Sequence, residues 1–272
     1  DIIGPGAAGG TNFLSTGGVV MNKIIVQNCS LQGFQKSLIY GNSTEDNIGA
    51  IRLSNVQISD LGGGQGTFDF RKSPIGSFTF ENSTIVGGRD FLRSDASTIS
   101  GSIAISNNTF VDVCGSKGNT NGLLYVRTDT QSFVFARNLV MYPALSTRIF
   151  SKAGCKVPEL SSNVFYNTDE ASYWAGAISK EQAIANGGAV VSSSPVKDLD
   201  GGDYTLTDAL CLSSNVGDPR WNPNAGTTST EITVSSVDEF LNALNAGKTA
   251  ITLKYGTYDF RTAENTSGDI TL

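Results

Sequence analysis

One short pattern of residues returns six times between residues 18 and 166. Apolar residues alternate along the chain, an asparagine follows them, and another apolar residue comes next, as in Ile24, Val26, Asn28 and Leu31. A fixed period of 20 to 50 residues is typical of a solenoid, in which each unit buries its apolar face only against its neighbours. The pattern therefore predicts a solenoid. Its asparagines recur every 25 to 31 residues, and in the last two copies one extra residue precedes the asparagine. The six are Asn28, Asn55, Asn82, Asn107, Asn138 and Asn163.

The repeats predict β-strands. Their apolar residues alternate with a period of two, and no copy has apolar residues at helical spacing. Two or three short strands per turn, stacked about 4.8 Å apart, make a parallel β-helix. We therefore predict an all-β chain with this fold. A second apolar strand follows in most copies, at residues 38–40, 68–70, 91–92, 123–126 and 149–150.

The recurrent asparagine has a physical role in such a coil. Asparagine tolerates left-handed backbone angles at a sharp turn, and its amide can bond the same amide one turn away. We predict an asparagine ladder along the coil. The alternative is six turn asparagines that make no contact with one another.

Composition narrows the functional classes. The chain has 19 Lys and Arg against 25 Asp and Glu, a net charge of -6, which argues against nucleic acid or an anionic membrane as the general partner. No apolar run approaches the length of a membrane span and no leader-like segment is found, so we expect no membrane insertion and a mature protein, extracellular or on a bacterial cell surface. Four widely spaced cysteines without a CxxC pair make a metal cluster unlikely and leave either free thiols or a disulfide.

The chain divides into five parts by composition. Residues 1–17 are glycine-rich and resemble the tail of a turn that begins elsewhere, and residues 18–166 carry the repeats. The repeat is lost in residues 167–221, which we interpret as a closing segment, and residues 222–230 have the composition of a linker. Residues 231–272 form a module of a different kind.

That last module has a strand, a capped helix and a second strand. Ser236 and Glu239 form a capping-box pattern before a helix that runs to Asn245, and Gly247 ends it. The apolar residues on one face of the helix and in the following strand are the ones we expect to serve in assembly: Val237, Phe240, Leu241, Leu244, Ile251 and Leu253.

Strand, helix, strand and the sequence YGTYDF at 255–260 resemble the N-terminal entry of pectin lyase-like proteins, a superfamily of right-handed parallel β-helices. In that superfamily the helix plugs the open end of the coil and precedes the repeats, whereas here it follows them. The resemblance implies a right-handed coil with a displaced cap. Three arrangements fit: the cap completes the same chain, it completes a neighbouring molecule head to tail, or the chain is one unit of a tandem array. We expect head-to-tail association.

Catalysis would have to proceed without histidine, because the chain has none. The segment TIVGGRDFLRSD at 84–95 is similar to the region around the nucleophilic aspartate of pectin methylesterases. The resemblance implies Asp90 as nucleophile, Asp69 as acid/base and Arg127 as the orienting arginine. That family's paired glutamine before the first aspartate and its Arg-Pro-Trp motif are absent. We expect no cofactor and no metal, with Ca²⁺ required only if the chemistry were that of a polyuronate lyase.

Carbohydrate binding is a function that requires fewer specific residues than catalysis does. Arg71, Arg93 and Arg127 each follow the last apolar residue of a second strand, so stacking would align three guanidinium groups beside Tyr125. Guanidinium pairs with carboxylate through two hydrogen bonds, which suits the uronates of an acidic polysaccharide. The alternative is a solvated ladder of arginine and aspartate that neutralises itself. We therefore expect a structural or carbohydrate-associating module that binds acidic or neutral polysaccharide and its own copies, with a polysaccharide esterase or lyase as the competing function.

Overall fold

The computed structural model describes residues 1–6, 10–95, 99–115, 122–142, 148–225, 232–245 and 251–254. The chain forms two compact units, residues 1–222 and residues 223–272. The sequence predictions for 255–272, for most of the linker and for most of the 115–122 loop lie outside the described residues. No described helix is long and apolar enough to cross a membrane.

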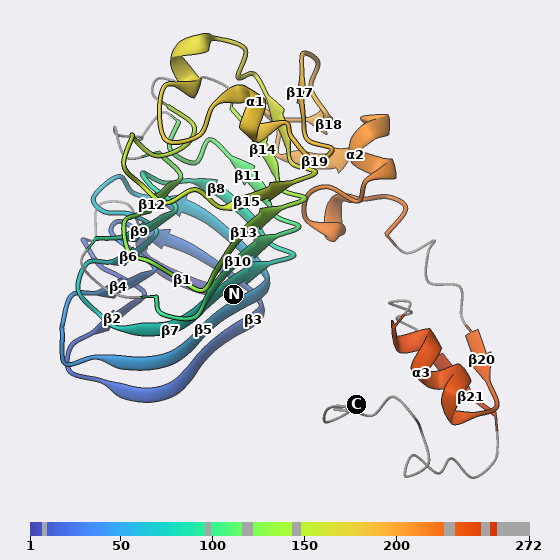
Figure 1. Cartoon of the computed structure of the whole chain (residues 1–272), viewed down its shortest axis with the longest axis horizontal. Coiled ribbons are helices and arrows are strands. Elements are labelled where there is room, and N and C mark those ends of the chain that lie inside the picture. The colour runs from blue at the N-terminus through green and yellow to red at the C-terminus, as the bar shows by residue number, and fades with distance from the viewer. Residues whose placement is uncertain are drawn as a thin grey trace. The chain divides into compact units, whose positions relative to one another are not determined.

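The first unit is a parallel β-solenoid of about six turns (Figure 1). Successive turns add one strand to each face, and all pairings between turns are parallel. The first face of the large sheet contains β3 (Val20–Phe34), β5 (Asn47–Leu61), β7 (Ile75–Glu81), β10 (Ser102–Ser106), β13 (Ser132–Ala136) and β15 (Glu159–Ser161).

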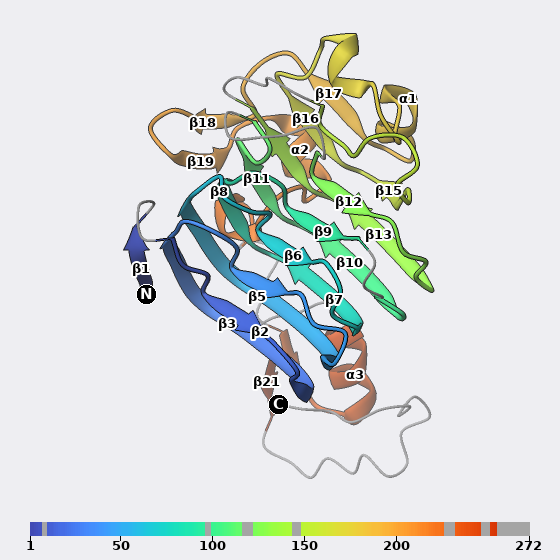
Figure 2. The ribbon, with the colours of Figure 1, turned by 90° about the vertical axis from the view of Figure 1, so that its left-hand side faces the viewer.

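The other two faces continue the coil. The second halves of β3 and β5 belong to a second face of the coil. The other strands of this face are β1 (Ile2–Gly6), β8 (Thr84–Gly87), β11 (Thr109–Val111), β14 (Leu139–Met141), β16 (Val164–Tyr166) and β17 (Ala189–Val191). A five-stranded sheet, here called sheet B, lies across from the first face (Figure 2) and contains β2 (Leu14–Thr16), β4 (Ile39–Gly41), β6 (Phe68–Phe70), β9 (Leu92–Ser94) and β12 (Leu124–Val126).

Inward-facing apolar residues fill the coil in register. Ile24, Ile51, Phe78, Ile103 and Phe133 stack from turn to turn, and from the second turn on they are buried. Phenylalanine rings continue this packing, with centroids about 5 to 6 Å apart. The period-two pattern of the repeats therefore corresponds to one continuous core, and the predicted fold class is confirmed.

In every turn the residue at the corner between the first two faces has a left-handed backbone conformation. Asn28, Asn55, Asn82 and Asn107 have φ between 51° and 57°, as the pattern predicts. In the next two turns Arg137 (φ 51°) and Ser162 (φ 54°) occupy the corner instead.

The asparagine ladder is therefore split between two columns. At the exposed corner Asn55 Nδ2 donates to Asn28 Oδ1 at 2.6 Å. One position further along the chain, Asn108, Asn138 and Asn163 form a fully buried ladder, with Nδ2 to Oδ1 distances of 3.0 and 3.2 Å. The prediction that Asn138 and Asn163 follow an extra residue is wrong, because they belong to this inner column.

A column of glycines allows the turns to approach closely elsewhere in the coil. A Cβ on Gly76 would lie 2.2 Å from the carbonyl oxygen of Gly49, and one on Gly101 would lie 2.5 Å from that of Gly76. Gly49 and Gly76 lie near the start of β5 and β7, and Gly101 directly precedes β10, so the backbones of the first face pack there without room for a side chain.

The closing segment turns back along the coil. It begins with η1 (Ala171–Trp174) and α1 (Lys180–Ala183), followed by the hairpin of β18 (Val196–Asp198) and β19 (Asp203–Leu206) and by α2 (Ala209–Ser213). The Gly217 N–H then bonds Arg137 O of the fifth turn, and the Asp218 N–H bonds Thr109 Oγ1 of the fourth. Within η2 (Pro219–Trp221) the chain reaches the third turn, where Trp221 Nε1 donates to Thr84 Oγ1 at 2.7 Å.

The four cysteines all lie in described residues, and none forms a disulfide. Burial raises the pKa of the Cys211 thiol to about 12 and also raises that of Cys155. Of the two alternatives, the structure supports thiols.

The first turn ends the coil with an open edge. No described strand pairs with the outer side of β3 between Val20 and Gln27. The inward residues Ile24 and Val26 are partly exposed there, whereas their counterparts one turn on, Ile51 and Leu53, are 1% exposed. This end of the coil leaves part of its core uncovered.

The second unit contains a parallel strand pair and one helix. β20 (Ile232–Val234) pairs with β21 (Ile251–Leu253), and α3 (Val237–Asn245) lies between them in sequence. Ser236 Oγ accepts from the Glu239 N–H, and the Glu239 carboxylate accepts from the backbone N–H and the hydroxyl of Ser235.

The residues of this unit that the sequence predicts to serve in assembly differ in burial. Phe240 is buried against Val234, with Ile251 and Leu241 packed beside them, while Val237 is partly exposed. The side chains of Leu244 and Leu253 lie outside the described set.

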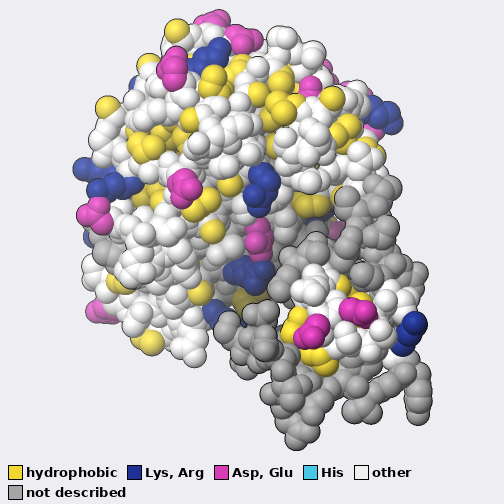
Figure 3. All heavy atoms as spheres, turned by 45° about the vertical axis from the view of Figure 1, so that its right-hand side comes forward, with side chains coloured by type: hydrophobic (Ala, Val, Ile, Leu, Met, Phe, Trp, Pro, Cys, Tyr) yellow, Lys and Arg dark blue, Asp and Glu magenta, His cyan; other side chains and the backbone are white. Residues whose placement is uncertain are grey.

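One face of the molecule carries apolar, acidic and basic side chains side by side. Figure 3 shows hydrophobic side chains in small groups between polar ones, with acidic and basic side chains interspersed. That face of the described chain offers no broad apolar area.

We predict that Asn138→Ala lowers the free energy of unfolding by about 2–4 kcal/mol. Asn138 Oδ1 accepts from both the backbone and the side chain of Asn108, and its loss leaves several buried groups unsatisfied. Asn42, an exposed asparagine, is the control, and Asn42→Ala should change stability by less than about 0.5 kcal/mol. Urea unfolding followed by circular dichroism measures both, and equal losses would contradict the buried ladder.

Candidate functional site

The predicted site residues lie on the outer side of sheet B. Strand pairing stacks Tyr40, Asp69, Arg93 and Tyr125 in one column, all pointing away from the core. Phe70, Ser94 and Val126 pair in the next, inward column. The register therefore determines which charged groups can meet.

The predicted stack of three arginines is wrong. Because Phe70 pairs with Ser94 and Ser94 with Val126, the residues that follow them place Asp95 between Arg71 and Arg127. Ser94 is fully buried at a position where the neighbouring turns have apolar residues. The last apolar residue of each strand is thus a poor marker of register.

Asp69 and Asp90, by contrast, do come together. A Cβ placed on Gly66 would lie 3.5 Å from the Cβ of Asp90 and 3.7 Å from those of Asp69 and Arg93. Both aspartates are 0% exposed beneath this glycine-rich loop. The two aspartates that the esterase resemblance singled out therefore both lie beside Gly66, and the arginine that shares this position is Arg93.

Arginines neutralise the buried carboxylates. Arg71 donates to both oxygens of Asp69, Nε to Oδ1 and Nη2 to Oδ2, each at 3.1 Å. Arg93 Nε lies 3.9 Å from Asp69 Oδ1, and Arg89 Nη2 lies 3.4 Å from Asp90 Oδ2. The hydrogen bond with Asp69 raises the pKa of Arg71 above its ordinary value. Paired, bidentate contacts of this kind offset the cost of burying charge.

Tyrosine rings flank these arginines. The Arg71 guanidinium lies 5.9 Å from the centre of the Tyr40 ring, and that of Arg93 lies 5.6 Å from the centre of Tyr125. Lys152 approaches the same Tyr125 ring at 5.2 Å. The cations are held in place by ring faces, within the range of cation–π attraction. Tyr125 itself is only 5% exposed, so its ring holds cations and offers little open face to a sugar.

The arrangement can bind anions more readily than it can perform nucleophilic attack. A carboxylate nucleophile must reach the substrate, and Asp90 is closed off from solvent. Arg127 is exposed in the column of Asp95, and the arginines that lie within 4 Å of Asp69 are Arg71 and Arg93. The described residues contain no group of three or more acidic or thiol side chains that could hold a metal ion.

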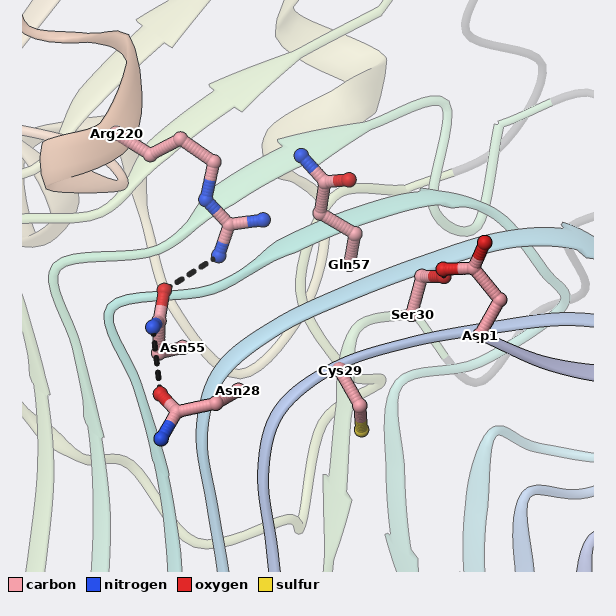
Figure 4. A pocket seen from close by; sticks show the side chains of 7 residues that line it. All are labelled: Asp1, Asn28, Cys29, Ser30, Asn55, Gln57 and Arg220. Atoms are coloured by element: carbon pink, nitrogen blue, oxygen red, sulfur yellow. Dashed lines mark hydrogen bonds between the residues drawn. The ribbon is translucent and has the colours of Figure 1, made fainter.

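A feature the sequence did not reveal lies on the opposite side of the coil. A pocket of about 310 Å³ opens beside the left-handed corners of the first two turns, beneath Arg220 of the closing segment (Figure 4). Asn28 and Asn55 belong to the repeat motif, but no sequence motif brings Arg220 to them from the distant closing segment.

Comparison with known families gives one partial match. A domain of unknown function (DUF4957) matches residues 4–87, which cover the first turns of the coil and Asp69. No curated protein and no solved structure matches the chain.

We predict that Arg71→Ala destabilises the fold by about 2–4 kcal/mol. The substitution leaves the buried Asp69 carboxylate without its bidentate partner, and a buried charge that loses its partner is costly. Lys72 is the matched control, since it is an exposed cation next in the chain, and Lys72→Ala should be nearly neutral. Denaturant unfolding of the two variants would refute the pairing if the losses were alike.

Proposed function

We propose that this chain is an exported structural module of the pectin lyase-like type that binds acidic polysaccharide along sheet B without cleaving it. The observation that supports this most directly is the layering of charge on that face. Asp69 and Asp90 are fully buried, and the guanidinium groups of Arg71 and Arg89 lie nearer the surface beside them. The described cations are Arg71, Arg89, Arg93, Arg127, Lys152 and Lys156, and the carboxylates are Asp69, Asp90, Asp95 and Asp129.

The local charge balance favours an anionic ligand. This face carries six cations against four carboxylates, although the whole chain has a net charge of -6. Two of the carboxylates are fully buried, whereas Arg127 and Lys152 are exposed. A polyuronate carries one carboxylate on each sugar, and guanidinium groups recognise carboxylates through paired hydrogen bonds.

We expect Arg127→Ala combined with Lys152→Ala to weaken binding of oligogalacturonate at least tenfold and to reduce its salt dependence. Both side chains are exposed, so the fold should be retained. The matched control removes two exposed cations from other parts of the surface, Lys23→Ala with Lys197→Ala. Isothermal titration calorimetry at low and high salt measures the difference. Equal weakening by both pairs would mean that only net charge matters.

The esterase reading remains the second candidate because Asp69 and Asp90 meet around Gly66. Methanol release from methylated pectin separates the two functions when the intact chain is compared with Asp90→Asn. Binding without release in either protein supports the module. Release by the intact chain that is lost in Asp90→Asn, with the fold unchanged, supports the esterase.

We further propose that the unit of β20, α3 and β21 of one molecule completes the first turn of another. The support is the open edge of β3 with its partly exposed core, together with a separate unit that carries a parallel strand pair. Strand addition supplies main-chain hydrogen bonds to such an edge, and a head-to-tail contact that does not close builds a filament.

Leu241→Asp should then abolish a concentration-dependent increase in mass, which light scattering measures on the intact chain. Asn242→Asp adds the same charge on the exposed side of α3 and should leave assembly unchanged. The closing segment returns the chain towards the first turn, and residues 223–231 span at most about 30 Å. A constant monomeric mass at all concentrations would therefore favour capping within one chain and contradict head-to-tail assembly.

A further inference from the structure

The pocket beneath Arg220 is built from two distant parts of the chain. Asn28, Asn55 and Gln57 come from the first two turns, and Arg220 comes from η2, 165 residues after Asn55. Ser30 and Asp1 form the remaining polar wall, joined by a hydrogen bond between the Ser30 hydroxyl and the Asp1 carboxylate. Figure 4 shows Gln57 standing between the Arg220 side chain and this wall.

A directed chain of hydrogen bonds orders one side of the pocket. Arg220 Nη2 donates to Asn55 Oδ1 at 2.9 Å, and Asn55 Nδ2 donates to Asn28 Oδ1 at 2.6 Å. Both asparagines are held in the left-handed conformation, which fixes the position of their side chains at the exposed corner. The Asn28 amide nitrogen and the remaining guanidinium N–H groups are left as donors at fixed positions.

Gln57 supplies both a donor and an acceptor. Its amide makes no hydrogen bond to any residue that the structure describes, although the side chain is partly buried within the pocket wall. An amide that presents C=O and NH₂ together can bond a hydroxyl group in either direction. The pocket thus combines hydrogen-bond donors, the guanidinium and amide N–H groups, with hydrogen-bond acceptors, the amide and carboxylate oxygens.

Charge argues against a phosphate or a polyuronate in this pocket. Arg220 Nη2 also lies 3.4 Å from Asp218 Oδ2, and Asp1 adds a second carboxylate. Burial raises the pKa of Asp218, whose oxygens accept from Thr84 and from the Arg220 N–H. The Arg220 guanidinium is therefore already paired with a carboxyl group, and a strongly anionic ligand would gain little.

We propose that this pocket, here called the Arg220 pocket, binds a neutral saccharide through neighbouring hydroxyl groups. Each hydroxyl both donates and accepts, which matches the mixed set from Asn28, Gln57, Arg220 and Asp1. A volume of about 310 Å³ lies at the lower end of the range for small-molecule sites, about 300–1,000 Å³, and suits a short saccharide segment. The proposal does not depend on polyuronate binding at sheet B, because the two sites share no residue.

Side-chain amide signals in ¹⁵N NMR test the proposal on the intact chain. The probes are the methyl glycosides of glucose, galactose, mannose and xylose, and their β-1,4-linked disaccharides. We expect at least one probe to shift the amide signals of Asn28, Asn55 and Gln57 in a saturable manner. Shifts of these signals by oligogalacturonate alone would overturn the assignment of a neutral ligand, and no shift with any probe would overturn the site.

Two substitutions then locate the binding. Gln57→Ala and Arg220→Lys should each weaken the interaction at least tenfold, whereas Gln27→Ala, an exposed glutamine outside the pocket, should not. Arg127→Ala at sheet B should also have no effect on the neutral probe. Binding that survives both pocket substitutions would contradict the proposal. Trp221 fluorescence checks that η2 keeps its place in the variants, since its indole bonds Thr84.

Discussion

Parallel pairing between successive turns is the constraint on which the structure depends. Each strand residue stacks on its counterpart one turn later, so a slip of one residue would exchange core and surface along a whole strand. The left-handed corner keeps this register, because a residue with φ near 54° recurs at the same place in every turn. Core packing, the asparagine ladder and the charge pattern of sheet B all follow from that alignment.

The sequence predicted the coil because the features that make it are local. Alternating apolar residues and an asparagine at the corner are visible without any tertiary contact. The errors arose where one residue type serves two roles. Asn138 and Asn163 stand in the buried inner column, where their amides bond between turns, while Arg137 and Ser162 take the strained corner without any sequence signal.

The candidate site was predictable only in part. Asp69 and Asp90 lie one repeat apart, and the structure brings them together around Gly66. The expected stack of three arginines was wrong because the buried Ser94 concealed the register of β9. The Arg220 pocket could not be anticipated, since it depends on a closing segment that returns to the second turn from a distant part of the chain.

The layering of charge on sheet B links the fold to the proposed function. Burying Asp69 fixes Arg71 by paired hydrogen bonds, and tyrosine rings fix the neighbouring cations. Groups held in this way lose little conformational freedom when they bind a ligand, which favours recognition. The same burial keeps Asp69 and Asp90 from a substrate, which is why we propose binding and not nucleophilic chemistry for this face.

The most direct measurement is an NMR titration of the arginine Nε–Hε signals of the intact chain with oligogalacturonate. We predict saturable shifts of Arg71, Arg93 and Arg127 on sheet B, whereas Arg52, which pairs with Glu81 on the first face, should be unchanged. Shifts spread equally over all arginines, or confined to Arg52 and Arg220, would contradict a polysaccharide-binding face on sheet B.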